Sequence, residues 1–193
     1  MIGLWNLNRL AHALSGLMTT DQLKQALSHY ETELMRVWGE RMRAKLGLLT
    51  ADANDNAILT QLLTLMTQEQ SDYTLTFRLL SDTQQHESRS ALRDEFIDRE
   101  AFDRWYDSYR QRLLQDEATD EQRQAVMKAA NPALVLRNYL AQQVIEEVER
   151  GEKTALERLH LALQQPFNDA AMSAELRQRP PEWGKTLEVS CSS

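Results

Sequence analysis

The chain has 193 residues, a length that indicates one domain or at most two small ones, and its 42% hydrophobic and 26% charged residues are typical of a globular protein. Six Gly and four Pro leave few turn-forming residues, which argues against a sandwich or barrel of many strands. No apolar run approaches the roughly 18 residues that span a bilayer, so we expect no membrane partner. Residues 1–10 lack the cationic and apolar segments of a secretion signal, which favours a cytoplasmic protein.

The net charge of −7 comes from 22 Lys and Arg against 29 Asp and Glu, and the acidic excess is spread along the chain. A nucleic-acid-binding protein needs a concentrated cationic surface, so we expect no nucleic acid as partner. The densest cationic cluster is Arg36, Arg41, Arg43 and Lys45. It falls in the last turns of an expected helix, where cations offset the negative end of the helix dipole, and we favour this interpretation over phosphate contact.

Apolar residues recur at helical spacing throughout the first half of the chain. The pattern predicts helices over 4–17, 20–47, 58–66 and 73–80. Thr20 and Ser71 are the expected N-caps of the second and fourth of these helices, and Gly47 is the expected stop of the second. Residues 81–90 form the longest polar interval and are predicted to be a mobile loop.

The second half continues the same periodicity beyond that loop. Capping signals are Asp98 before an aromatic-rich helix and Thr119 with Gln122, which have the spacing of a capping box. Asn131-Pro132 has the pattern of a helix start, which predicts a helix from there to Val148, closed by Gly151. A last helix is expected over 156–163, before Pro166.

The predicted fold is therefore all-α, an irregular bundle of about eight helices with no convincing strand. We predict one helical domain over residues 1–179, followed by an extended C-terminal tail over 180–193 that carries Cys191. The first helix is already in register at Leu4, with no capping residue before it and with Trp5 beside its apolar stripe. This suggests a chain that begins inside a structural element, and a frayed N-terminus is the alternative.

Residue patterns that carry known chemistry are absent. The glycines are too scattered for a phosphate-binding loop, and the four histidines include no pair at i,i+4 spacing. Residues 52–56 imitate the start of a calcium loop, but Ala57 and Leu63 stand where that loop needs Gly and Glu, so we predict a cap and polar turn. We therefore predict no catalytic, cofactor-binding or metal-binding residue in this chain, and a metal-dependent enzyme is the weakest hypothesis.

Two polar or aromatic groups allow more than one interpretation. The stripe Phe102, Trp105, Tyr106 and Tyr109 could line a ligand pocket, but aromatic residues at helical spacing are more typical of a core. Arg137 and Asn138 lie in the middle of the predicted 131–148 helix. They either join a buried hydrogen-bond network or face solvent, and the sequence leaves both possibilities open.

Four segments together resemble the C-terminal portion of the selenoprotein O family, also called SelO or YdiU. They are GLWNLNRLA (3–11), DYTLTFRLL (72–80), NPALVLRNYLAQ (131–142) and PPEWGKTLEVSCSS (180–193). The resemblance implies a protein-kinase-like fold with atypical active-site chemistry. Members of that family transfer AMP from ATP to Ser, Thr or Tyr hydroxyls of other proteins, using a divalent metal such as Mg or Mn.

In that family the nucleotide-binding lobe and the catalytic residues lie upstream of the segment that resembles residues 3–11. The resemblance therefore implies a fragment that is structural or regulatory and inactive alone, whose partner is the missing N-terminal kinase-like part. Protein substrates belong to the full-length family. The alternative is a stand-alone helical module that binds a protein partner.

Cys191 is the one candidate site residue. The resemblance places it where animal members of the family carry a selenocysteine, and so implies a redox role. An inert terminal cysteine is the alternative. As the single cysteine of the chain it cannot form an internal disulfide, which agrees with a reducing cytoplasm.

Overall fold

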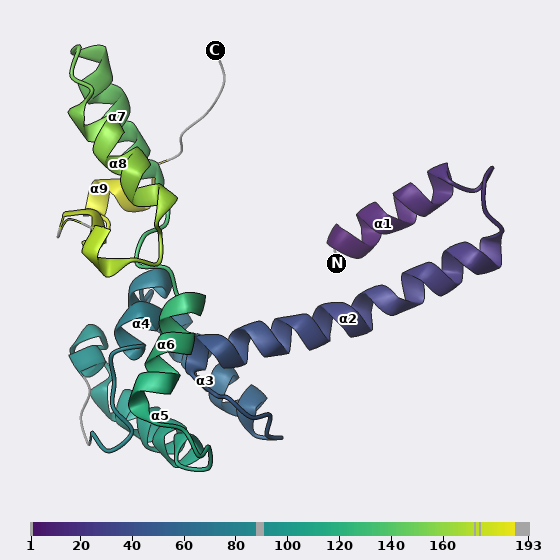
Figure 1. Cartoon of the computed structure of the whole chain (residues 1–193), viewed down its shortest axis with the longest axis horizontal. Coiled ribbons are helices and arrows are strands. Elements are labelled where there is room, and N and C mark those ends of the chain that lie inside the picture. The colour runs from purple at the N-terminus through teal and green to yellow at the C-terminus, as the bar shows by residue number, and fades with distance from the viewer. Residues whose placement is uncertain (1, 88–90, 172, 174, 188–193) are drawn as a thin grey trace. The chain divides into compact units, whose positions relative to one another are not determined.

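A computed structural model describes residues 2–87, 91–171, 173 and 175–187 (Figure 1). Within these ranges every regular element is a helix, which confirms the all-α class. The described residues form nine α-helices where about eight were expected, and the additional one is α9. The α-helices are α1 (Ile2–Ala13), α2 (Thr20–Leu46), α3 (Asp55–Gln68), α4 (Tyr73–Leu80), α5 (Arg99–Leu113), α6 (Asp120–Ala130), α7 (Asn138–Glu149), α8 (Thr154–Gln164) and α9 (Glu182–Lys185). Three short 3-10 helices are η1 (Ala91–Glu95), η2 (Asp169–Ala171) and η3 (Glu175–Arg177).

The chain divides into two compact units, Met1–Met42 and Arg43–Ser193. The first unit holds α1 and most of α2, joined by a short turn (Figure 1). A capping box forms at Thr19, whose backbone N–H donates to Gln22 Oε1 at 2.9 Å while its hydroxyl accepts from Gln22 N at 3.3 Å. The cap of α2 is thus Thr19 and not Thr20, because only Thr19 has the three-residue spacing to a glutamine.

Helix α2 ends at Gly47, as predicted. Gly47 has a φ of +68°, and the N–H of Leu48 donates to Arg43 O at 3.0 Å, which closes the last turn. A Cβ at this position would lie 2.5 Å from Arg123 Cγ and 2.6 Å from Met127 Sδ. Both the backbone conformation and the close approach of α6 therefore require glycine here.

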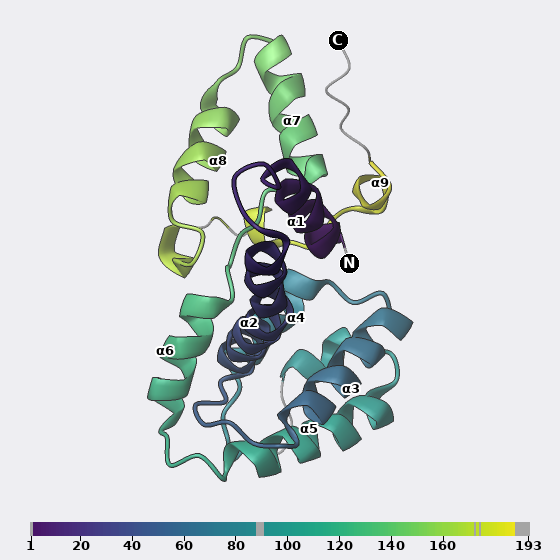
Figure 2. The same ribbon diagram turned by 90° about the vertical axis from the view of Figure 1, so that its right-hand side faces the viewer.

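The core of the second unit is built on the packing of α3 against α5, which lie side by side in Figure 2. The Trp105 and Tyr109 rings stack with centroids 5.2 Å apart. The Trp105 indole donates to Ile58 O at 3.0 Å, and the Tyr109 hydroxyl donates to Leu46 O at 2.7 Å. The aromatic stripe of α5 is therefore core and not a ligand pocket. The polar tips of Trp105 and Tyr109 have backbone partners, whereas the buried Tyr106 hydroxyl has no hydrogen-bond partner among the described residues.

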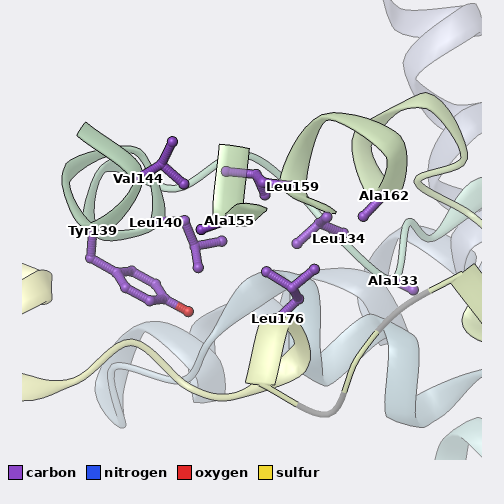
Figure 3. Close-up of a cluster of buried hydrophobic side chains, with 9 residues drawn as sticks. All are labelled: Ala133, Leu134, Tyr139, Leu140, Val144, Ala155, Leu159, Ala162 and Leu176. Carbon is purple, nitrogen blue, oxygen red and sulfur yellow. The ribbon is translucent and has the colours of Figure 1, made fainter. Parts of the chain in front are cut away.

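A second apolar cluster joins α7, α8 and η3 (Figure 3). Leu140 and Val144 of α7 meet Leu159 of α8, and Leu176 of η3 packs beside them. Leu187, beyond α9, is also packed against this cluster. The C-terminal residues up to 187 thus cover the α7–α8 pair.

The predicted helix over 131–148 is wrong at its start. Asn131 is the C-cap of α6, and α7 begins seven residues later, at Asn138. The buried Asn131 amide donates to Lys45 O at 2.9 Å and to Ser81 Oγ at 3.1 Å. Ala133 N and Leu134 N both donate to Pro166 O. Residues 132–137 are thus a non-helical segment that is attached to the chain beyond α8.

Three further expectations need correction. Asp72 and not Ser71 caps α4, since its carboxylate accepts from Leu75 N at 2.9 Å. The predicted mobile loop is packed in its described part, residues 81–87, where Gln85 N donates to Asp120 Oδ1 at 3.0 Å. Residues 182–185 are helical where an extended tail was predicted, because Trp183 packs edge-on against Tyr139. The domain boundary after residue 179 stays a prediction.

The first helix ends at Ala13 and not at Leu17 as predicted. Three further signals are confirmed. Asp98 caps α5 by accepting from Ala101 N, and Thr119 with Gln122 forms a capping box at α6. Gly151 follows α7 with a φ of +88°.

Candidate functional site

Arg78 of α4 connects three segments of the second unit. Its Nη1 donates to Asn131 O at 2.7 Å and Lys128 O at 3.1 Å, and its Nη2 donates to Phe167 O at 3.2 Å. Its Nε and Nη2 also form an ion pair with Asp169. All five N–H donors of this buried guanidinium are thus used within the protein. Arg78 holds α4, α6 and η2 together and has no donor left for a ligand.

Arg137 forms a two-point ion pair with Asp72 at the start of α4. Burial alone would raise the pKa of Asp72, but the Arg137 hydrogen bonds and the Leu75 N–H outweigh it and lower that pKa below its ordinary value. Of the two possibilities left open, Arg137 therefore belongs to a partly buried polar network. Its neighbour Asn138 is exposed, yet its amide donates to Leu187 O at 3.0 Å.

A cleft of about 270 Å³ lies beside these two arginines, and it is also lined by Leu134, Asp169 and Arg177. Each arginine in its wall is already paired with a carboxylate. Arg78 and Arg137 form the ion pairs described above, and Arg177 lies 4.0 Å from Asp169 Oδ1. An anionic ligand would have to break one of these pairs. The arrangement joins α4 to the α7–α8 pair and does not form an anion site.

Arg112 is the centre of an ion-pair network whose members are all buried, and its own side chain is 3% exposed. Its Nε donates to Asp55 Oδ1 at 2.7 Å, its Nη1 to Asp116 Oδ1 at 3.0 Å and its Nη2 to Thr50 O at 2.8 Å. Burial would raise the pKa of Asp116, but hydrogen bonds from Thr50, Arg112 and Leu49 lower it below its ordinary value. This network fixes the loop after α2 onto α3 and α5.

Arg123 of α6 is equally enclosed, beside Gly47. Its Nη2 donates to Thr83 O and to Asp120 Oδ1, and its Nη1 lies 3.1 Å from Met127 Sδ. Its Nε has no hydrogen-bond partner among the described residues. None of Arg78, Arg112 and Arg123 was predicted from the sequence to be a structural centre. A signal for Arg112 existed, because Arg112 and Asp116 continue the buried stripe of Tyr109 and Leu113.

The predicted site residue, Cys191, lies outside the described residues, and its redox role stays a prediction. Residues 52–56 form the predicted polar turn, in which Asn54 N donates to Asp52 Oδ1 at 2.8 Å and Asp52 N to Asp55 Oδ2 at 2.9 Å. All four histidines are exposed. In the parts of the chain that the structure describes, no group of three His, Cys, Asp or Glu is placed to hold a metal ion. No helix in those parts is long and apolar enough to cross a membrane.

The first unit presents an unusual number of large apolar side chains to solvent. Helix α1 has no buried residue, and Met42 is the one buried residue among 2–42. We call the exposed apolar side chains of this unit the hairpin surface. They are Ile2, Leu4, Trp5, Leu10, Leu17, Met18, Leu34, Met35 and Trp38. Large apolar side chains exposed in such number are typical of a surface that is covered by a partner.

Comparison with known proteins places the chain in a family. The family model described as protein adenylyltransferase SelO matches residues 1–164. Similar proteins include the protein nucleotidyltransferases YdiU of Erwinia tasmaniensis, 68% identical over 193 residues, and of Yersinia pseudotuberculosis, 58% identical over 192 residues. Both matches cover 100% of this chain and 40% of the relative, so the chain spans about two-fifths of their length. The chain belongs to the protein adenylyltransferase SelO family.

Proposed function

We propose that this chain is the helical C-terminal part of a SelO-type enzyme that transfers AMP from ATP to hydroxyl side chains of other proteins. In this proposal the chain supports the kinase-like part and does not transfer AMP by itself. The observation that carries the proposal is the hairpin surface. Trp5 is 58% exposed and Leu17 is 84% exposed, and such side chains gain free energy when a partner removes them from water.

The proposed partner of the hairpin surface is the remainder of the same family protein. Support comes from the coverage, because the full chain matches relatives of which it spans 40%. The proposal places ATP and a divalent metal, Mg or Mn, in that remainder. The buried Arg78, Arg112 and Arg123 are engaged with carboxylates and carbonyls of this chain, and its scattered glycines form no phosphate-binding loop.

The test is co-expression of this chain with the part of the Erwinia tasmaniensis relative that it does not cover. We expect the two pieces to purify together and the pair to transfer labelled AMP from ATP to a protein. Trp5→Asp and Leu10→Asp place a charge on the hairpin surface and should reduce co-purification about tenfold or more. Leu161→Asp is the matched control, because Leu161 is as exposed as these residues but lies on α8.

Two results would contradict the proposal. One is a chain that stays alone on co-expression, which is the outcome expected of a stand-alone interaction module. The other is a clear rise in the melting temperature of this chain alone with millimolar ATP and Mg²⁺, because a ligand stabilises only the protein that binds it.

We also propose that Cys191 is an accessible, oxidisable thiol, as its resemblance to the family's selenocysteine position implies. In the isolated chain, diamide would accept two hydrogens from the Cys191 thiols of two molecules, and one intermolecular S–S bond would form. We expect a dimer on a non-reducing gel that disappears in Cys191→Ser. Absence of the dimer would favour an inert terminal cysteine.

A further inference from the structure

Helix α3 has an exposed face without charge. Residues 56–68 form the longest stretch of the chain without Asp, Glu, Lys or Arg, although 26% of all residues are charged. Apart from Ala57, the exposed side chains of this stretch carry only hydroxyl and amide groups at their tips. They are Asn56, Thr60, Gln61, Thr64, Thr67 and Gln68. Solvent-facing helix surfaces usually carry charges of both signs, so this face differs from an ordinary solvated one.

This face forms one wall of a groove of about 460 Å³ between α3 and α5. Thr60, Thr64 and Gln68 line it from α3, and Arg104 and Ser108 line it from α5. The two helices run beside each other in Figure 2. None of its lining residues is acidic.

The floor of the groove is rigid. Trp105 and Leu65 lie there, and both are buried. The Trp105 ring is fixed by its hydrogen bond to Ile58 O and by its stacking on Tyr109. A preformed floor lowers the entropic cost of binding, because little of the protein has to be ordered by the ligand.

Arg104 is the cation of the groove, and it is exposed. The other arginines of α5 are paired: Arg99 with Asp94 at 3.2 Å, Arg110 with Asp107 at 3.8 Å, and Arg112 with Asp55 at 2.7 Å. Arg104 has no ion pair or side-chain hydrogen bond within the described residues. Its guanidinium is therefore available to a carboxylate from outside the chain.

We propose that the α3–α5 groove binds an extended, acidic peptide segment of a protein partner. A carboxylate of the peptide pairs with Arg104, and the peptide backbone bonds to the hydroxyl and amide groups of α3. Hydroxyl and amide side chains both donate and accept, as a peptide backbone requires. A single cation in an acidic protein does not fit a nucleic acid, which needs several phosphate contacts. This inference is independent of the proposed function.

The test uses the complete chain and a defined probe, the capped peptide acetyl-Ser-Ala-Ser-Glu-Glu-Ala-Ser-Ala-amide. Backbone amide shifts of the isotope-labelled chain report where it binds. We expect a dissociation constant of about 1 mM or below, with shifts confined to 56–68 and 101–108. Added salt should weaken the binding, because the contact with Arg104 is exposed and screened.

Arg104→Gln removes the cation but keeps a polar side chain, and it should weaken binding about fivefold. Arg99→Gln is the matched control on the same helix, outside the groove, and should leave binding unchanged. Replacing both Glu of the peptide by Gln should raise the dissociation constant by the same factor as Arg104→Gln does. Replacing them by Lys should raise it further. Thr64→Val keeps the side-chain shape and should weaken the Glu and Gln peptides equally, through loss of a hydroxyl.

The inference would be overturned by shifts that map elsewhere or by an Arg104→Gln variant that binds the acidic peptide as tightly as the parent chain does. It would also be overturned if the Lys peptide bound as tightly as the Glu peptide. Tighter binding of an oligothymidylate than of the acidic peptide would also overturn it, since the groove would then be selecting phosphate. Each measurement uses this chain alone, so its failure leaves the co-expression test of the proposed function unaffected.

Discussion

The two units of the chain carry the same amphipathic pattern but bury it differently. In the first unit, α1 has no buried residue although leucines recur along it at helical spacing. In the second unit, Phe102, Tyr106 and Tyr109 of α5 are almost completely enclosed. The difference teaches that an apolar stripe shows that a helix needs a partner, but not that the partner lies in the same chain.

Ion pairs differ between the units in the same way. Arg36 of the first unit pairs with Glu33 and Glu40 of its own helix, and all three side chains are about half exposed. Arg112 of the second unit joins α5 to α3 and to the preceding loop, away from water. Exposed pairs add little stability, whereas a buried pair is costly to break because its partner remains charged and unsolvated.

The largest effect should come from breaking the buried pair. Arg112→Leu leaves Asp55 and Asp116 without their cation, and we expect the free energy of unfolding of the second unit to fall by about 3–5 kcal/mol. Urea denaturation followed by tryptophan fluorescence measures it, because Trp105 lies in the same core. Arg36→Ala is the matched control in the first unit and should leave the midpoint unchanged. Equal effects of the two variants would contradict the contrast between the units.

The next effect concerns Gly47, where α2 ends against α6. Gly47→Ala forces a positive φ on a residue with a Cβ and overlaps it with Arg123 and Met127. We expect a loss of about 2–4 kcal/mol in the same denaturation experiment. Gly151→Ala is the matched control, because Gly151 also has a positive φ but nothing lies within 4 Å of the added Cβ. It should cost about 1 kcal/mol. If Gly47→Ala and Gly151→Ala lower the free energy of unfolding equally, the contact of Gly47 with α6 is not tight.

A smaller and pH-dependent effect is expected at Asp72. The pKa of Asp72 is lowered in the folded state, so its stabilising contribution is complete above its unfolded pKa of about 3.9 and is lost as the pH falls through the lower folded value. Asp72→Asn keeps the cap of α4 but removes the charge opposite Arg137. It should cost about 1–2 kcal/mol at pH 7 and progressively less below pH 4.

Denaturation at several pH values compares Asp72→Asn with the parent chain. The pKa of Asp116 is also lowered, so its protonation at low pH reduces the stability of both proteins. This contribution cancels in the difference between them. A difference that stays constant from pH 7 to about pH 2.5 would show that the ion pair adds no stability.

Several features set by neighbouring residues were predictable from the sequence, although the caps of α2 and α4 each lie one residue away from the predicted ones. The caps at Asp98 and Thr119 and the stop at Gly47 depend on residues within one turn, and all three are confirmed. The start at Asn131-Pro132 is wrong for the opposite reason. The Asn131 side chain bonds to Lys45 and Ser81, which lie far away in the sequence, and this contact ends α6 where the local pattern indicated a helix start.

The candidate sites divide along the same line. The core role of Tyr109 follows from helical spacing, but the pairing of Arg78 with Asp169 depends on the fold and left no local signal. The hairpin surface was partly predictable, because Trp5 lies beside the apolar stripe of α1 and the sequence indicated no residue that would cover it. The redox role of Cys191 rests on resemblance and stays a prediction.

The smallest effect should come from the hairpin surface itself. Leu17→Ala removes the same atoms as Leu62→Ala, but Leu17 is 84% exposed and Leu62 is completely buried. We expect the free energy of unfolding to change by less than about 0.5 kcal/mol for Leu17→Ala and by about 2–5 kcal/mol for Leu62→Ala. In the co-expressed pair, Leu17→Ala should become more costly, because its partner would then cover the side chain. If Leu17→Ala already destabilises the isolated chain as much as Leu62→Ala does, the leucine is covered without a partner. The hairpin surface would then be closed within the chain, and the observation that carries the proposed function would be lost.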